Sequence, residues 1–439
     1  MIKVSIPDIC QPEIKYTIDC LLGAFLGLNY EISVQAGQKN VFFNVGKKKI
    51  TIKNYFFHFN NTKILYNQNT IPITTNSGVI STDSQFHKIT SLFGTSSLTK
   101  EGDSFLLEAD IISSTFFMLA RWEEQINSVR DKHNRFPGSA SLAHKEGFLE
   151  RPIVNEYIEL LWSLLKSIGC QQIRKERNFK IVPTHDVDVP YLWWGKKEKY
   201  KYFLSRAYRC QTKEFFNNLK LGFDNKDPYD TYDKFMNLSE KAGVKSNFFF
   251  MTGGNSRYDN FYSINHPRVI KLIQHIRNRG HNIGLHPSYN SYNSLVLLRQ
   301  EKETLEKIIN DKIFIGRQHY LRFEAPTTWR LWEELGMEWD STLSYADYCG
   351  YRCGVCYPFP VYDFLGRKQL NLIERPLILM EGSIINYEKL SPTEGIEKVV
   401  KLKKLTKKYS GEFIFLWHNS AFNNEQFMGY EDMLNAMYR

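Results

Sequence analysis

Two aspartates that stand two positions apart carry the strongest chemical signal in the sequence. Asp186 and Asp188 follow the short apolar run of "KIVPTHDVD". Side chains two positions apart on a strand leave the same face, so the two carboxylates are expected close together. Neighbouring carboxylates ionise together comfortably only when a cation or a basic residue joins them. The pattern indicates one metal ligand and one general base, with a pair of surface or capping aspartates as the alternative.

A histidine and an asparagine resemble half of a second metal-binding motif. His286 in "GLHPSYN" ends another apolar run, and Asn290 stands four positions later, where a second histidine would complete a ligand pair. An amide oxygen is a neutral and harder donor than an imidazole, so Asn290 should bind zinc more weakly than a histidine would. The sequence leaves open an altered metal site and a site that has lost its metal.

Further polar residues lie where other apolar runs end. His418 follows "FIFLW" and is suited to general acid catalysis near neutral pH, with a hydrogen-bonded core histidine as the alternative. Arg322 in "RFEAP" could orient Asp186 or bind an anionic group of a substrate, and His319 lies near it in the sequence. For both residues the alternative is a solvated position in a loop.

Three cysteines in "CGYRCGVC" have the spacing of a radical iron–sulfur loop. In such enzymes the loop follows an early strand and precedes a glycine-rich cofactor stretch, whereas Cys349, Cys353 and Cys356 come late and no such stretch follows. We therefore expect no iron–sulfur cluster. A structural zinc site with a fourth ligand elsewhere is an alternative. Reduced thiols fit better, because the seven cysteines of the chain come without an export signal.

The elements that must position these residues alternate between strand and helix from about residue 179 onward. "SNFFFMTGG" and "HNIGLHP" have the pattern of strands, and Pro267 and Gly280 mark the start and the end of the helix between them. Such alternation predicts parallel strands with crossover helices. In a barrel of this kind reactive side chains project from the C-terminal ends of the strands. Polar residues at four strand ends therefore predict one convergent site.

The first part of the chain has a different texture. Residues 1–172 mix short β-like runs with two helices over residues 109–126 and 154–169, and the charged "QQIRKERNF" separates this part from the rest. A chain of 439 residues is long enough for two domains. We expect a smaller α+β domain over residues 1–172 and an α/β domain over residues 179–439.

The composition narrows the range of partners. The formal charge of +10 is spread over several clusters, and no zinc-finger, helix-turn-helix or RNA-binding pattern accompanies it, so nucleic acid is not an expected partner. The sequence has no run of about 18 apolar residues and no signal peptide, which predicts a cytoplasmic chain without a membrane span. The aromatic residues Tyr191, Trp193, Trp194 and Trp417 lie close to the first and last motifs, where they could stack on sugar rings or pack between the domains.

With these motifs in place, the C-terminal two thirds of the chain resembles the polysaccharide deacetylase family (carbohydrate esterase family 4). "THDVD", "GHNIGLHPSYN", "RFEAP" and "FLWH" correspond in order and spacing to four motifs of that family, over roughly residues 179–425. The N-terminal part is similar to an accessory domain that precedes such barrels in some bacterial surface-polysaccharide loci. The resemblance implies a distorted (β/α) barrel of about seven parallel strands. It also implies an enzyme that hydrolyses an N- or O-acetyl group on a saccharide, with water activated by a divalent metal.

The resemblance implies a role for each matching residue. Asp186 would be the general base, Arg322 would position it, and His418 would be the general acid. A divalent metal, with zinc as the first expectation, would be held by Asp188, His286 and Asn290. The candidate substrate contacts are Tyr191, Trp193, Trp194, Trp417 and His319. The expected partner is an acetylated saccharide or saccharide precursor of surface-polysaccharide biosynthesis. Because Asn290 replaces a ligand histidine, the alternative is a catalytically weak or inactive carbohydrate-binding protein on a deacetylase scaffold. The sugar, the acyl group and the oligomeric state are left open.

Overall fold

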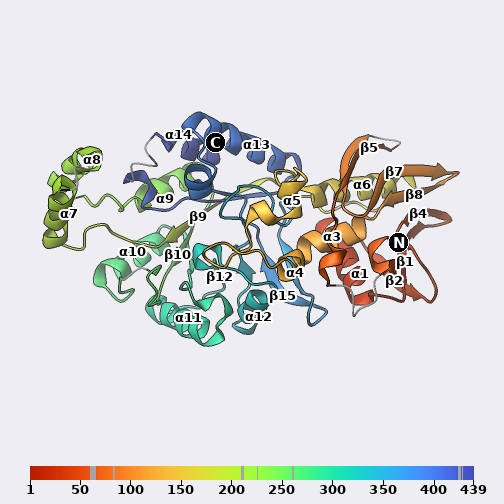
Figure 1. Cartoon of the computed structure of the whole chain (residues 1–439), viewed down its shortest axis with the longest axis horizontal. Coiled ribbons are helices and arrows are strands. Elements are labelled where there is room, and N and C mark those ends of the chain that lie inside the picture. The colour runs from red at the N-terminus through yellow and green to blue at the C-terminus, as the bar shows by residue number, and fades with distance from the viewer. Residues whose placement is uncertain are drawn as a thin grey trace.

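The chain forms two main sheets with helices around them (Figure 1). The computed structural model describes residues 1–59, 66–82, 85–208, 212–224, 226–259, 262–423, 427 and 429–439. A six-stranded sheet comes from the N-terminal region, and a nine-stranded sheet comes from the C-terminal region. A hairpin of β5 (Asn76–Ser81) and β6 (Phe86–Ser91) contacts the first sheet through β7.

The six-stranded sheet mixes parallel and antiparallel pairs in the order β2-β1-β3-β4-β8-β7. Its strands are β1 (Ile2–Pro7), β2 (Tyr30–Gln35), β3 (Val41–Val45), β4 (Lys48–Ile52), β7 (Gly94–Glu101) and β8 (Ser104–Ala109). Alternate residues of β1 are buried, so the sheet has one core face. The main helices of this region are α1 (Gln11–Ile18), α3 (Ile111–Ala120), α4 (Glu123–Ile126) and α6 (Ile153–Ser167). The helix predicted over 109–126 is divided into α3 and α4, because Arg121 between them takes a left-handed backbone conformation with φ 55°.

The nine-stranded sheet has the order β14-β15-β13-β12-β11-β10-β9-β17-β16, and every neighbouring pair is parallel except β14 with β15. Its strands are β9 (Lys180–Val187), β10 (Asn247–Phe250), β11 (Asn282–Leu285), β12 (Ile315–Gly316), β13 (Trp339–Asp340), β14 (Phe359–Asp363), β15 (Lys368–Glu374), β16 (Leu379–Met380) and β17 (Glu412–Leu416). The prediction of parallel strands is confirmed. No backbone pairing joins the edge strands β14 and β16 in the part of the chain that the structure describes, so a closed barrel stays a prediction.

Helices connect the parallel strands, as the sequence predicts. They are α7 (Lys196–Tyr208), α8 (Thr212–Phe223), α9 (Tyr232–Lys241), α10 (Pro267–Asn278), α11 (Leu295–Ile309), α12 (Thr327–Glu334) and α13 (Pro392–Lys408), and α14 (Glu431–Tyr438) ends the chain. Pro267 begins α10, and the Ser294 hydroxyl caps α11 by accepting a hydrogen bond from the Leu297 N–H at 3.5 Å. Among the described helices, none combines the length and the apolar character that a membrane crossing requires.

Buried charges join the N-terminal region to the C-terminal region. Glu124 of α4 accepts hydrogen bonds from Arg121 Nε at 2.8 Å and from Arg352 Nε at 2.9 Å. Arg121 also donates to the Arg352 backbone oxygen at 2.7 Å and to the Tyr345 hydroxyl at 2.9 Å. Removing one partner of such a network would leave an uncompensated buried charge. Residues 170–179 have no helix or strand, but the contacts between the regions are extensive, and a domain division at this segment stays a prediction.

Candidate active site

Polar side chains that follow four parallel strands meet at one place. Asp186 lies in β9 and Asp188 just after it, while His286, His319 and His418 follow β11, β12 and β17. The Nε2 atoms of His286 and His319 lie 3.2 and 3.6 Å from Asp188 Oδ1. Nε2 of His418 lies 3.6 Å from Asp188 Oδ2. The four residues that the sequence singles out therefore lie together, and His319 joins them.

Asp188, His286 and His319 form a group that fits a divalent metal. Their ligand atoms lie within 4.8 Å of one another. Asp188 Oδ1 is buried without a hydrogen-bond partner among the described residues, as expected of an oxygen that binds a cation. His286 Nδ1 lies 2.7 Å from the Arg317 backbone oxygen, which favours a proton on Nδ1 and leaves Nε2 able to bind. One carboxylate with two imidazoles is a usual donor set of catalytic zinc sites, which keep one position open.

The residues of this group shift the pKa values of one another. Burial raises the pKa of Asp188, but the neighbouring imidazoles of His319, His286 and His418 outweigh burial and hold that pKa well below its usual range. Burial lowers the pKa of His286, but the carboxylates of Asp186 and Asp188 outweigh it and raise the pKa. Asp188, which is only partly buried, is therefore an anion at neutral pH, and its charge attracts a cation to this position.

A buried arginine, Arg317, positions Asp186. Its Nη1 donates to Asp186 Oδ1 at 2.9 Å and to Thr184 Oγ1 at 2.9 Å, and its Nε donates to the Ser341 backbone oxygen at 2.8 Å. The second carboxylate oxygen, Asp186 Oδ2, lies 3.8 Å from His286 Nε2. Asp186 thus has one oxygen fixed by Arg317 and the other turned toward the candidate metal ligands.

A buried glutamate, Glu381, fixes His418. Glu381 Oε1 accepts a hydrogen bond from the His418 backbone N–H at 2.9 Å and contacts Nδ1 of the same residue. Burial lowers the pKa of His418, but the Glu381 carboxylate, with help from Asp188 and Asp186, raises it to about 10. His418 therefore carries a proton at neutral pH, with Nε2 facing Asp188, which is the state that a general acid requires.

Arg317, Glu381 and the ligand position of His319 are not predicted by the sequence motifs. Each residue follows a strand of only two residues, β12 or β16. Arg317 and His319 come just after β12 and stand two positions apart, the same spacing as Asp186 and Asp188. That spacing is a usable signal, but β12 has only two residues and leaves no apolar run that would mark a strand end here.

The side chain of Asn290, which the sequence predicts as the third ligand, makes its hydrogen bond with Arg322. The residue is exposed, and its Oδ1 accepts a hydrogen bond from Arg322 Nη1 at 3.4 Å. A guanidinium beside this oxygen opposes the binding of a cation there. His319, which follows the neighbouring parallel strand β12, brings a second imidazole close to Asp188 and His286.

Substitution of Asn290 should therefore have little effect on metal binding. Asn290→Ala should keep the zinc affinity within about twofold of the wild type, the range expected for an exposed position. Asn290→His should not tighten binding, because the side chain is turned toward Arg322. Competition with a chromophoric zinc chelator measures both. A tenfold gain in zinc affinity for Asn290→His would contradict this expectation and show that residue 290 can reach the metal.

Arg322 does not contact Asp186, and the positioning role predicted for it falls to Arg317. Its Nε donates to the His133 backbone oxygen at 3.0 Å, and its Nη1 donates to the Tyr289 backbone oxygen. Its guanidinium lies 4.0 Å from the centre of the Tyr289 ring. Arg322 therefore fixes the loops around the site rather than the base.

The N-terminal region reaches the loop that carries His319. Arg135 Nη1 donates to the Tyr320 backbone oxygen at 2.8 Å, and Arg135 Nη2 donates to the Tyr387 hydroxyl at 3.1 Å. Tyr320 has a left-handed backbone conformation with φ 61°, which a tyrosine rarely adopts without support. The contacts from His133 and Arg135 supply that support next to a candidate metal ligand.

Most of the predicted sugar-stacking residues belong to the core. Tyr191, Trp193 and Trp417 are buried. Trp194 is half-buried, with its ring centre 4.9 Å from that of His266. Stacking on a sugar needs an open ring face, so the three buried residues are assigned to packing.

The cysteines of "CGYRCGVC" are buried, and none belongs to the metal-binding group found among the described residues. Burial raises the pKa of the Cys349 thiol to about 12, and it raises the pKa of Cys353 and Cys356 further. Thiols in this state are poor metal ligands, because the thiolate is the binding form. That the chain lacks an iron–sulfur cluster stays a prediction, and Cys210 lies outside the described residues.

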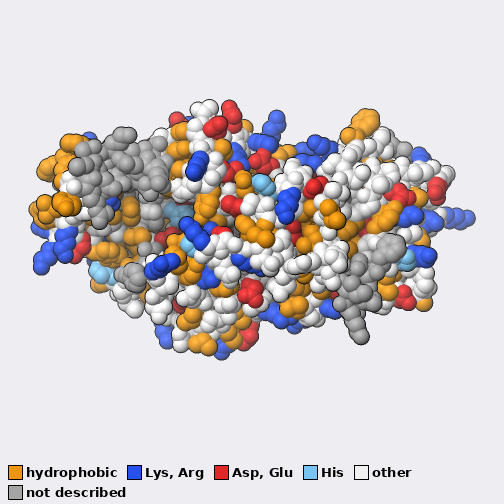
Figure 2. Space-filling model, in the orientation of Figure 1, with side chains coloured by type: hydrophobic (Ala, Val, Ile, Leu, Met, Phe, Trp, Pro, Cys, Tyr) orange, Lys and Arg blue, Asp and Glu red, His pale blue; other side chains and the backbone are white. Residues whose placement is uncertain are grey.

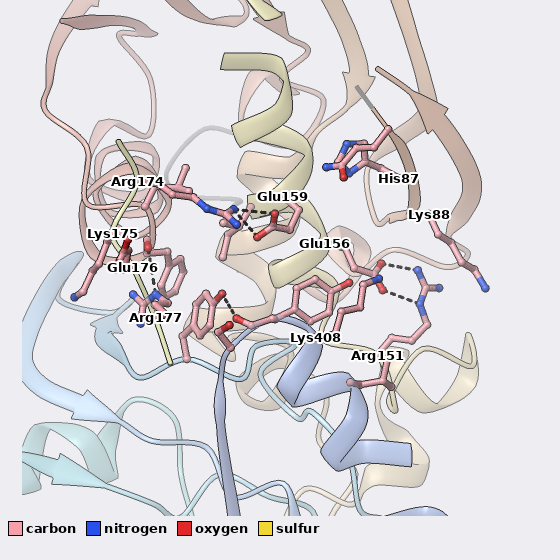
Figure 3. A pocket seen from close by; sticks show the side chains of 18 of the residues that line it. His87, Lys88, Arg151, Glu156, Glu159, Arg174, Lys175, Glu176, Arg177 and Lys408 are labelled. Atoms are coloured by element: carbon pink, nitrogen blue, oxygen red, sulfur yellow. Dashed lines mark hydrogen bonds and ion pairs between the residues drawn. The ribbon is translucent and has the colours of Figure 1, made fainter. Parts of the chain in front are cut away.

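A cavity of about 740 Å³ opens at the other end of the nine-stranded sheet (Figure 3). It is lined by residues that precede β9 and β17, such as Arg177, whereas the candidate site follows the C-terminal ends of the strands. Several of its charges neutralise one another, since Arg151 pairs with Glu156 and Arg174 with Glu159 (Figure 3). The cavity is therefore separate from the candidate site and holds none of its residues.

One family model matches the chain, and the match covers only the N-terminal region. Residues 2–169 match the model of a "Family of unknown function (DUF7033)". No curated protein matches the chain.

Solved structures similar to this chain include two described as deacetylases and a pseudoenzyme of carbohydrate esterase family 4. A presumed polysaccharide deacetylase from Mycobacterium smegmatis is 16% identical, with 60% of this chain and 83% of that chain covered and a TM-score of 0.37. The chitin deacetylase of the fungal pathogen Colletotrichum lindemuthianum is 14% identical (60% and 84% covered, TM-score 0.30). The pseudoenzyme, from Bacillus anthracis, is 12% identical (60% and 62% covered, TM-score 0.29).

Proposed function

We propose that this chain is a metal-dependent hydrolase that removes an N- or O-linked acetyl group from a saccharide. The observation that carries the proposal is the pair of proton-transfer groups around the Asp188 ligand group. Asp186 Oδ2 lies 3.8 Å from Nε2 of His286. On the other carboxylate, Asp188, the oxygen Oδ2 lies 3.6 Å from Nε2 of His418. Hydrolysis of an acyl group needs a base that takes a proton from the attacking water and an acid that protonates the leaving nitrogen or oxygen.

In this scheme Asp186 is the base. Its Oδ2 takes a proton from the attacking water, while Arg317 holds Oδ1 and so keeps the carboxylate in one orientation. The water oxygen forms a bond to the acyl carbon, and the bond from that carbon to the sugar nitrogen or oxygen breaks.

In the same scheme His418 is the acid. Its Nε2 gives its proton to the departing nitrogen or oxygen, so acetate and a free amine or alcohol are the products. Glu381, in contact with Nδ1, keeps the imidazole protonated before the reaction and fixes its orientation.

Asp188, His286 and His319 are the residues that would hold the metal, and zinc is the proposed ion. The chemistry that a bound ion supplies is Lewis-acid catalysis, which lowers the pKa of water toward about 7 and stabilises negative charge on the acyl oxygen. The three donors leave room for further ligands, as in catalytic rather than structural zinc sites.

Tyrosines beside the site are the proposed contacts for the sugar. The Tyr320 ring lies 4.6 Å from the His319 ring, and the Tyr258 and Tyr289 rings lie 4.5 Å apart beside it. Tyr258 and Tyr320 are only half-buried, so their rings can contact a ligand. Tyrosine offers an apolar face and a hydroxyl, the combination that sugar rings require. The proposed substrate is an acetylated saccharide or saccharide precursor of surface-polysaccharide biosynthesis.

The alternative is a catalytically weak or inactive carbohydrate-binding protein. Its support in the sequence is the asparagine at a ligand position. That support is weakened, because His319 brings a third donor to Asp188 and His286.

Acetate release from acetylated saccharides tests the proposal. Asp186→Asn should lower turnover by about 10²–10⁴-fold with the zinc content unchanged, because an amide of the same shape cannot accept the proton. Asp8→Asn, at an exposed position that follows β1 of the N-terminal sheet, is the matched control. Thermal unfolding of both variants checks that the loss of the Arg317 ion pair has not unfolded the protein.

The outcome that contradicts the proposal concerns the wild-type protein. No acetate release from a panel of N- and O-acetylated saccharides, with zinc, cobalt or manganese supplied, would exclude the proposed hydrolase. If the same folded protein bound one of these sugars, the carbohydrate-binding alternative would replace it.

A further inference from the structure

Two helices just after the first motif form an arm at one end of the molecule (Figure 1, left). The arm consists of α7 and α8, which contact each other, and it leaves the nine-stranded sheet at the C-terminal end of β9, the edge where the candidate site lies. No described residue of α7 is buried. The arm is therefore attached beside the site but contributes little to the core.

The base of the arm is fixed to the rest of the fold. The Trp193 ring packs against the Phe203 ring of α7 with ring centres 5.5 Å apart. The Trp193 backbone N–H donates to Asp227 Oδ2 at 2.7 Å, and the Trp193 backbone oxygen accepts from Arg268 Nη1 at 2.8 Å. These contacts hold the arm at a defined place relative to Asp188, five positions before Trp193 in the sequence.

The arm exposes a set of large apolar side chains. Their exposed fractions are 68% for Tyr200, 72% for Leu204, 90% for Tyr208, 64% for Phe216 and 78% for Phe223. On α7 the three residues are four positions apart, and on α8 the two are seven positions apart, so each helix presents them on one face. Figure 2 shows hydrophobic side chains gathered at this end of the molecule. Single exposed apolar residues are normal on a surface, but a cluster of five marks an interaction surface.

Basic residues accompany these apolar side chains. Residues 196–226 contain nine Lys or Arg and only three Asp or Glu. Lys196, Lys197 and Lys201 on α7 and Lys220 on α8 are exposed, and Figure 2 shows Lys and Arg side chains beside the hydrophobic ones at this end. The surface therefore requires a partner that accepts apolar side chains and carries negative charge.

An anionic lipid bilayer has both properties. Tyrosine, phenylalanine and leucine enter the boundary between headgroups and acyl chains, while lysines at the sides of the helix contact anionic headgroups. A second copy of the arm would repel the first through its excess of positive charge. A nucleic acid would contact the lysines but gives Leu204 no hydrocarbon to enter, and base stacking uses aromatic rings.

We propose that α7 and α8 dock the protein on the surface of an anionic lipid bilayer. The helices lie along the surface and do not cross it, in agreement with the finding that no described helix could span a membrane. Where the proposed function also holds, the saccharide that reaches the candidate site is one presented at the bilayer surface, such as a lipid-linked precursor. That consequence rests on the proposed function, whereas the docking itself does not.

Sedimentation with lipid vesicles tests the docking. The full-length protein should bind vesicles that contain phosphatidylglycerol, bind vesicles of phosphatidylcholine alone much more weakly, and dissociate as salt is added. Lys196→Glu with Lys197→Glu should weaken binding by at least about 25-fold, since each basic residue near an anionic surface contributes about fivefold. The second double variant, Leu204→Asp with Tyr208→Asp, should have a larger effect and abolish vesicle binding at physiological salt.

The matched control is Val296→Asp, an exposed apolar position on α11 outside the arm. It should bind vesicles like the wild type, and thermal unfolding should show that all variants are folded. The proposal is overturned if wild-type protein does not bind anionic vesicles at low salt, or if Val296→Asp weakens binding as much as the arm variants. It is also overturned if the arm residues instead support a dimer in gel filtration or binding to a nucleic-acid duplex.

The two proposals fail separately. Arm variants should release acetate from a short water-soluble acetylated saccharide as fast as the wild type. Vesicle binding without any acetate release would remove the proposed hydrolase and leave the docking intact. Acetate release without vesicle binding would exclude the docking and leave the proposed hydrolase intact.

Discussion

His319→Ala should remove the metal and the activity together. The imidazole of His319 is one of the three candidate ligands, with Asp188 and His286, and its Nε2 lies 3.6 Å from Asp188 Oδ1. Loss of a residue that merely supports a ligand costs 10–100-fold in metal affinity, so loss of the ligand itself should cost at least about 100-fold. Zinc content after dialysis and acetate release measure the two effects.

The control for this substitution is Asn290→Ala, which should keep both zinc and turnover. A high zinc concentration should restore part of the activity of His319→Ala, because the other donors remain in place. If His319→Ala retains stoichiometric zinc and wild-type turnover after dialysis, His319 is not a ligand and the metal site assigned here is wrong.

His418→Ala should lower turnover by about 10²–10⁴-fold while the protein keeps its zinc. The substitution removes the proposed acid but none of the three metal donors. The loss should appear mainly in kcat, since His418 acts on the leaving group during the reaction. A variant that keeps most of its turnover would exclude His418 as the acid.

Glu381→Gln should shift the pH dependence of turnover rather than abolish turnover. Glu381 is the largest influence that raises the pKa of His418 to about 10. Its loss lowers this pKa toward the ordinary value of about 6.5. An acid must be protonated to act, so activity lost at high pH in the wild type should be lost at lower pH in the variant. Profiles of kcat against pH that coincide for the two proteins would contradict this role.

The sequence predicts the parts of the site that follow long apolar strands. Asp186, Asp188 and His418 come at the ends of β9 and β17, where hydrophobic runs of normal length mark the strand. His286 follows β11, whose preceding helix has a clear start and end. For these residues the rule that reactive groups follow the C-terminal ends of parallel strands is sufficient.

The sequence cannot predict the residues that depend on very short strands or on packing. Strands β12 and β16 have two residues each, too few for a periodic pattern, and Arg317, His319 and Glu381 follow them. The burial of Trp193 and Trp417 depends on residues distant in the sequence, so aromatic residues beside a motif cannot be divided into core and ligand contacts from the sequence alone. The same reason explains why residues 1–172 show no link to the site until the fold is known.

The contacts of Arg135 and His133 with the loop around His319 change how the two regions of this chain must be regarded. A catalytic module that could be cut out and moved to another protein would carry every support of its ligands within its own boundaries. Here the backbone beside a candidate ligand is held by residues that come some 190 positions earlier in the chain. Replacing the first region with an unrelated one would remove these supports, so the two regions are best treated as one structural unit.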